Sequence, residues 1–125
     1  MREIINAKIT KYNLGFEDHA IFTLYILLEF DGGGQGFGGN CLDKPEKDSN
    51  GRFVERVGTS FGCQYLMEVL RTLELRDYSE LVNTVVRIDH EHTKIHGIGN
   101  ALKDKWFYPD KLADKYYPKE TPDEK

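Results

Sequence analysis

Residues 30–41 read Phe-Asp-Gly-Gly-Gly-Gln-Gly-Phe-Gly-Gly-Asn-Cys, and six of the twelve glycines in the chain lie in this stretch. Asp31 followed by three glycines is typical of a tight hairpin turn. Glycine loses more backbone entropy on folding than other residues, so an ordered protein uses it where the backbone needs a positive φ or where something approaches closely. Two interpretations are open: the glycines allow tight packing of a strand, or they let a ligand or another protein reach the main chain.

The segments on both sides of this turn predict strands. Residues 3–12 alternate between apolar and polar side chains, which is typical of a half-buried strand. Residues 20–30 are rich in Ile, Phe, Tyr and Leu and predict a long central strand antiparallel to the first, and residues 36–42 would return as a third strand. Residues 84–90 and 94–98 predict a second hairpin with its turn at Glu91 or His92.

The clearest helix is predicted over residues 59–73, where apolar side chains recur at helical spacing and Thr59 or Ser60 can cap the start. A shorter helix is expected from Asp77 or Tyr78 to Val82, and a brief helical turn after Pro109. Residues 43–53 are charged and contain Pro45, so they predict a solvated loop or the tip of a hairpin.

The order of these elements predicts an α+β fold in which an antiparallel sheet of about five strands is covered by one main helix and a short second helix. A small, partly open barrel is the alternative. We expect one domain over residues 1–117 and a disordered, charged tail over residues 118–125.

The composition limits the classes of function. The 125 residues carry a net charge of −4, which disfavours avid binding to a nucleic-acid backbone. The two cysteines form no paired motif, the chain begins without a signal peptide, and the longest apolar run, residues 20–28, is too short to span a membrane. We therefore expect a cytoplasmic protein with no membrane contact.

The motifs for catalysis and for metal binding are weak. His90 and His92 could share a face and hold a metal with a carboxylate, but neither H-E-x-x-H nor C-x-x-C is present. Gly34, Gly36 and Gly39 match a G-x-G-x-x-G spacing, but a strand follows them instead of a helix. We expect no enzyme activity, no catalytic residue, no cofactor and no metal, and a metal-dependent enzyme remains the second alternative.

A constellation of side chains from distant segments suits a nucleotide-like ligand. Aromatic rings can stack on a base, and amides, imidazoles and lysines can bind the polar groups. The candidate ligand-binding residues are Gln35, Phe37, His96, Asn100, Lys103 and Trp106. Replacing Gly36 or Gly38 with alanine should unfold the domain if the glycines serve packing, and should spare folding but abolish activity if a ligand approaches there.

Four segments carry a resemblance to a known family. They are LGFEDH at residues 14–19, GQGFGG at residues 34–39, VGTSFG at residues 57–62, and residues 94–107, which include KDKWF. Together they resemble a family of small, mostly uncharacterised proteins encoded by phages and prophages of bacteria. Residues 66–89 are also similar to phage single-strand-binding proteins of barrel type, although Asn83-Thr84 stands where that family has Gly-Lys before the basic strand.

The resemblance to phage proteins implies an accessory protein that acts by stoichiometric binding. It would neutralise a host defence protein or sequester a small nucleotide signal in the bacterial cytoplasm. The alternative is a replication accessory of barrel type that binds single-stranded nucleic acid. The negative net charge makes nucleic acid the less favoured partner. Exposed strand edges beside glycine invite pairing between chains, so we expect a homo-oligomer.

Overall fold

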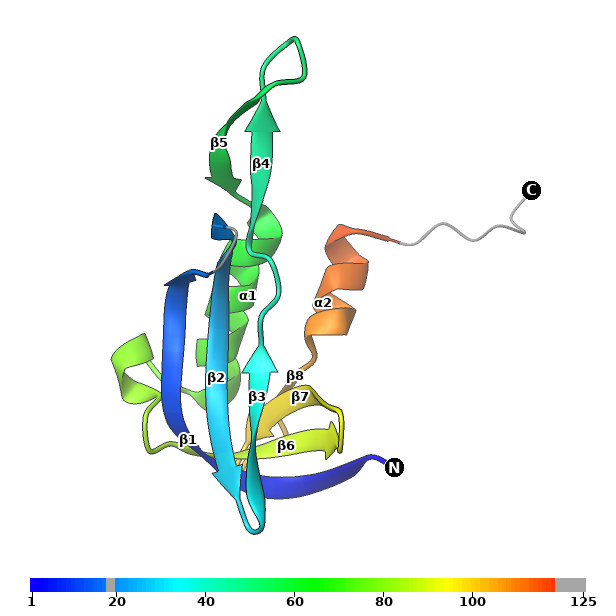
Figure 1. Cartoon of the computed structure of the whole chain (residues 1–125). Coiled ribbons are helices and arrows are strands. Elements are labelled where there is room, and N and C mark those ends of the chain that lie inside the picture. Colours follow the sequence, from blue (N-terminus) through cyan, green and yellow to red (C-terminus); the bar gives the residue numbers. More distant parts are fainter. Residues whose placement is uncertain (18–19, 119–125) are drawn as a thin grey trace, which may run out of the picture.

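The computed structural model describes residues 1–17 and 20–118 (Figure 1). The chain forms, in order, β1 (Glu3–Phe16), β2 (Phe22–Phe30), β3 (Gly33–Gly38), β4 (Asp43–Lys47), β5 (Phe53–Gly58), α1 (Ser60–Leu73), the 3₁₀ turn η2 (Tyr78–Glu80), β6 (Val85–Glu91), β7 (Lys94–Asn100), β8 (Trp106–Phe107) and α2 (Pro109–Tyr116).

Six of these strands form one antiparallel sheet in the order β3-β2-β1-β6-β7-β8, and β4 and β5 form a separate hairpin. The predicted α+β class is confirmed, with β8 as a strand beyond those expected. β6 returns after α1 to lie beside β1, so the order β6-β1-β2-β3 is a Greek key. The long strand β1 serves two partners: residues 3–8 pair with β6, and residues 8–16 pair with β2 past an irregularity between Ile9 and Lys11.

The core lies between the sheet and the helices, and α1 lies behind β1 and β2 in Figure 1. Thr59 caps α1 as predicted, because its hydroxyl accepts a hydrogen bond from the Gly62 amide. Gly62 lies against the Leu42 backbone, where a Cβ would stand 2.1 Å from the Leu42 carbonyl oxygen. The fully buried side chains come from the sheet, α1, the η2 region and the β3–β4 connection: Ile9, Leu24, Ile26, Leu28, Leu42, Tyr65, Val69, Leu81, Val86, Ile88 and Ile98.

The sheet curls, as in the alternative prediction of a small, partly open barrel. β3, at one end of the strand order, comes into contact with β7 near the other end. Within the described residues, however, no hydrogen-bonded ladder joins β3 to β7, so the sheet stays open along this seam.

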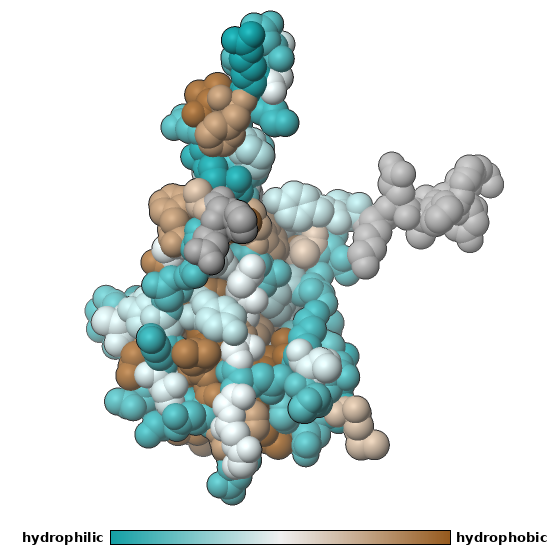
Figure 2. All heavy atoms as spheres, viewed as in Figure 1, coloured by the Kyte–Doolittle hydropathy of each residue, from teal (hydrophilic) through white to brown (hydrophobic). Residues whose placement is uncertain are grey.

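The hairpin of β4 and β5 projects beyond the body of the domain (Figure 1). This confirms the hairpin interpretation of the charged segment, although strands extend on both sides of the tip. Phe53 and Val54 are exposed on β5, and Figure 2 shows a hydrophobic, brown area on this arm.

An ion pair anchors the base of the hairpin to the sheet. The Arg56 guanidinium donates from Nε to Asp43 Oδ2 at 2.8 Å and from Nη2 to Asp43 Oδ1 at 3.0 Å. The Phe22 amide also donates to Asp43 Oδ1, at 3.2 Å. The Asp43 side chain is only 5% exposed. Because hydrogen bonding to Arg56 favours its charged form, the pKa of Asp43 falls from 3.8 to about 2.

Acid should therefore weaken the domain through Asp43. A carboxyl group whose pKa is lower in the folded chain stabilises it above the unfolded pKa of 3.8, and this contribution is lost as the pH falls toward about 2. We expect a loss of about 2 kcal/mol in the free energy of unfolding over this range from Asp43 alone. Urea titrations of the wild type and of Asp43→Asn at pH 6 and pH 3 would measure about half of this loss, about 1 kcal/mol, because at pH 3 the folded carboxyl group is still mostly ionised. An equal pH dependence in both proteins would contradict the assignment.

Some sequence predictions differ from the structure. The third strand begins at Gly33 and ends at Gly38, instead of spanning residues 36–42, because it pairs directly after the turn with the end of β2. Cys63, which lies on α1, is exposed. The predicted tail falls outside the described residues from position 119 onward. No helix in the described part of the chain has the length and apolar character needed to cross a membrane.

Candidate functional site

A cleft opens where β3 and β7 separate. It has a volume of about 360 Å³, and it is lined on one side by residues 36–40 and on the other by residues 93–96. Tyr25 on β2 and the start of α2, at Pro109 and Asp110, complete its rim. The volume lies at the small end of the range for small-molecule sites. We call this site the seam cleft.

Tyr25 lies across the glycine strand at the rim of the seam cleft. A Cβ added to Gly36 would stand 1.9 Å from Tyr25 Oη and 2.3 Å from Tyr25 Cζ, so only glycine leaves room for the ring in this position. The Tyr25 residue is 41% exposed. Its ring therefore rests on bare main chain and keeps part of its surface available for another planar group.

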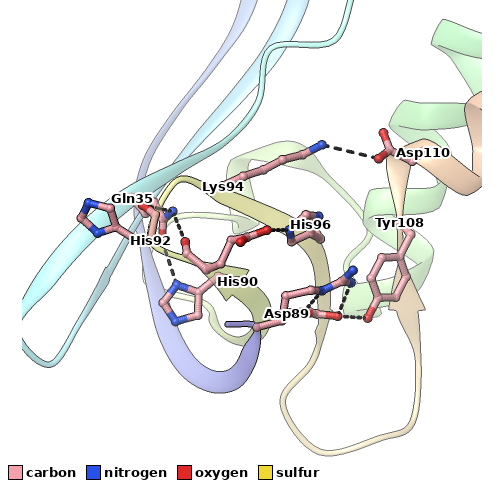
Figure 3. A network of polar contacts seen from close by, with 10 residues as sticks. Gln35, Asp89, His90, His92, Lys94, His96, Tyr108 and Asp110 are labelled. Atoms are coloured by element: carbon pink, nitrogen blue, oxygen red, sulfur yellow. Dashed lines mark hydrogen bonds and ion pairs between the residues drawn. The ribbon is translucent and has the colours of Figure 1, made fainter.

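Gln35 closes one end of the seam with its side chain (Figure 3). Its Nε2 donates to the carbonyl oxygen of Glu91 at 2.9 Å, and its Oε1 lies 2.9 Å from His90 Nδ1. Because Nε2 donates to a carbonyl, Oε1 is the acceptor, and the Nδ1 of His90 carries the proton. Both polar groups of the Gln35 side chain are therefore used in hydrogen bonds that join β3 to the end of β6.

Charged groups gather at the wall and mouth of the seam cleft. Lys94 Nζ reaches Asp110 Oδ2 at 3.4 Å, and both side chains are well exposed (Figure 3). His96 Nε2 lies within hydrogen-bond distance of Glu91 Oε2. The hydrogen bond from His96 lowers the pKa of Glu91 below its ordinary value. The cleft thus offers one ammonium and one imidazole, each beside a carboxylate.

Phe37 differs from the expected exposed ligand residue, because it is among the residues that line the cleft but is only 3% exposed. Strand alternation turns this ring inward, where it packs edge-on against Phe107 with ring centroids 6.5 Å apart. Its neighbours Gly36 and Gly38 also border the seam cleft. Of the six predicted residues, Gln35, Phe37 and His96 lie along the seam, and the other three lie elsewhere.

The other three residues belong to a cluster near the end of α1. Asn100 Nδ2 donates to the Thr72 carbonyl at 3.1 Å, and its Oδ1 accepts from the amides of Leu102 and Lys103. Lys103 Nζ lies 3.0 Å from both carboxylate oxygens of Glu74. These contacts stabilise the turn between β7 and β8, so Asn100 and Lys103 have structural partners away from the seam cleft.

Trp106 also has structural partners. Its ring lies over Gly99, where a Cβ would come within 2.7 Å, and the Arg87 guanidinium stands 5.0 Å from the ring centroid. Tyr108 lies in the same way over Gly97 and stacks beside Trp106 at a centroid distance of 5.9 Å. Three aromatic rings in this domain thus cover glycines of a neighbouring strand, which stabilises glycine-rich strands.

The candidate metal ligands do not converge in the described part of the chain. His90 uses Nδ1 for Gln35, and His92 is exposed on the turn. No group of three or more His, Cys, Asp or Glu side chains suited to a metal ion occurs among residues 1–17 and 20–118. His19 lies outside these residues.

Sequence reasoning missed Tyr25, Asn40 and Asp110 as members of the site. Tyr25 could have been found, because alternation along β2 places it on the same face as the exposed Glu29. Asn40 accepts from the Tyr65 hydroxyl at 3.0 Å and so joins the cleft to α1, and Asp110 arrives from a distant helix. The positions of Asn40 and Asp110 in the site depend on long-range packing, which leaves no local pattern in the sequence.

We compared the chain with protein-family models, curated proteins and solved structures, and none of them matches it.

Proposed function

We propose that this protein acts by stoichiometric binding of a small nucleotide-like ligand in the seam cleft. The observation that carries the proposal is the unpaired seam between β3 and β7, which leaves a cleft of about 360 Å³ beside an exposed tyrosine on a bare glycine strand. A missing strand pair in a curled sheet leaves room that a ligand can fill.

The side chains around the cleft suit the two halves of a nucleotide. The free part of the Tyr25 ring would stack on the base, an interaction worth about 1–3 kcal/mol per base. The Lys94 ammonium, from the opposite wall, would face the phosphate. His96 lies on the same wall and would add a hydrogen bond.

The size of the cleft and its charge favour a mononucleotide over a long polyanion. Each of the two basic groups stands beside a carboxylate, so neither adds an unopposed positive charge, and the whole chain carries −4. Binding to a phosphate backbone needs clustered, unpaired lysines and arginines. Sequestration of a small signal nucleotide fits these properties, and the neutralisation of a host defence by a phage-type protein stays a prediction from the resemblance.

Isothermal titration with AMP would test the proposal. We expect one AMP per chain, and a loss of affinity of about tenfold in Tyr25→Leu, because the stacking surface is removed. Tyr25→Phe keeps the ring and should bind nearly as the wild type does. Wild-type protein without measurable affinity for AMP, GMP, CMP or UMP would contradict the proposal, as would equal affinities in the two Tyr25 variants.

A second candidate is a single-stranded nucleic-acid-binding protein, which the strand topology favours. A five-stranded, partly open Greek-key barrel is the architecture of the OB-fold, whose ligands lie on strands 2 and 3 between the first and last hairpin loops. The seam cleft occupies the comparable place, beside β2, β3 and the β6–β7 turn. Tight binding of a dT oligonucleotide that weakens steeply with salt, together with no binding of mononucleotides, would select this candidate.

A further inference from the structure

Asp110 stands at the mouth of the seam cleft, where it belongs to the first turn of α2. Its Oδ2 lies 3.4 Å from Lys94 Nζ, and the exposed fractions of the two side chains are 74% and 52%. Figure 3 shows the Lys94 side chain reaching from the β6–β7 hairpin to the helix. Among the described residues, Lys94 is the one that brings an ammonium to the cleft lining, and it is already engaged by a carboxylate.

We infer that Asp110 determines the charge selectivity of the seam cleft, since it competes with an anionic ligand for Lys94 and repels added negative charge. This inference rests on the proposed function and deepens it. The ligand class that follows is a nucleotide with few phosphates, because each further phosphate must enter near the Asp110 carboxylate.

The other basic groups around the mouth do not take the place of Lys94 as a partner for a ligand phosphate. His96 is engaged by Glu91, which adds a second carboxylate near the wall. Lys111, one residue after Asp110, lies with Nζ 4.8 Å from the centroid of the Tyr108 ring. Lys94 is thus the cation that a ligand phosphate would reach within the cleft, and Asp110 is the group that must release it.

The size of the effect follows from the exposure of the pair. An exposed ion pair contributes little, because water and salt screen it. Removal of the Asp110 charge should therefore raise the affinity for a monophosphate by about threefold. The gain should grow with the number of ligand charges and vanish for an uncharged nucleoside.

The experiment is a titration of adenosine, AMP, ADP and ATP into the wild type, Asp110→Asn and Asp114→Asn. Asp114 lies on the same helix and is exposed, but it does not line the cleft, so its variant is matched for charge. We expect Asp110→Asn to bind AMP about threefold tighter and ATP tighter still by a larger factor, with adenosine unchanged. Asp114→Asn should bind all four as the wild type does.

A double-mutant cycle shows whether the gain acts through Lys94. In a Lys94→Gln background, Asp110→Asn should raise the AMP affinity less than it does in the wild type. If wild-type protein binds AMP but Asp110→Asn gives no gain, or the same gain as Asp114→Asn, the inference is overturned and the proposed function stands. If neither protein binds any nucleotide, both are overturned.

Discussion

Gly38→Ala is expected to lower the free energy of unfolding by about 3 kcal/mol, because two effects add at this position. Gly38 has a φ of +110°, which side chains disfavour, and a Cβ there would stand 2.2 Å from the Leu24 carbonyl oxygen. The obstacle is main chain of the neighbouring strand, so it cannot rotate away. Urea denaturation followed by far-UV circular dichroism would measure the loss.

Gly33→Ala is the matched control for this prediction. Gly33 lies on the same strand, its φ is not positive, and the nearest atom to an added Cβ is Phe30 Cε1 at 3.9 Å. We expect this variant to stay within about 1 kcal/mol of the wild type. If Gly38→Ala were as stable as Gly33→Ala, the described path of the chain at the end of β3 would be wrong.

Gly36→Ala is expected to fold normally and to lose nucleotide affinity by about tenfold. The three nearest atoms to an added Cβ all belong to the outer end of the Tyr25 side chain, at 1.9–2.9 Å. That side chain is partly exposed and can turn toward solvent, so the fold survives while the ring leaves its place. Titration with AMP and urea denaturation of the same preparation would separate affinity from stability.

A Gly36→Ala protein that unfolds like Gly38→Ala would show that Tyr25 over Gly36 is needed for packing alone. A stable variant with wild-type affinity would show that the ligand does not use the ring. The two glycines therefore give opposite expected results, two residues apart on one strand. If both results are as expected, packing accounts for Gly38 and binding for Gly36, and the two interpretations of the glycine-rich stretch apply to different residues.

Most of the fold could be predicted from local sequence. Local patterns predicted α1 and five of the strands within a few residues, and they also predicted Thr59 as a helix cap and a short helix near Asp77. The two-residue strand β8 was not predicted, because its pairing with β7 depends on long-range contacts instead of a repeat of apolar residues. β4 is mostly charged, and the apolar residues Phe53 and Val54 of β5 are adjacent and both exposed, so neither strand carries an apolar alternation that reveals it.

The site could be predicted only in part. The glycine-rich stretch was found because its composition is unusual, and His96 does lie on the cleft wall. Asn100, Lys103 and Trp106 were grouped with it because aromatic and basic residues cluster there in the sequence, but the turn after β7 directs them to α1 and to the outer face of the sheet. Proximity in sequence could not show that β3 meets β7, since about 60 residues separate these strands.

The most direct test of the account is to map the AMP site by ¹H–¹⁵N NMR on uniformly labelled protein. We expect AMP to change the chemical shifts of the backbone amides in the cleft walls, at residues 36–40 and 93–96. Changes around Trp106 should stay small. Saturation with one AMP per chain would support the seam cleft as the binding site. Shifts centred on Trp106 and α2 beyond Asp110, or no shifts at millimolar AMP, would contradict it.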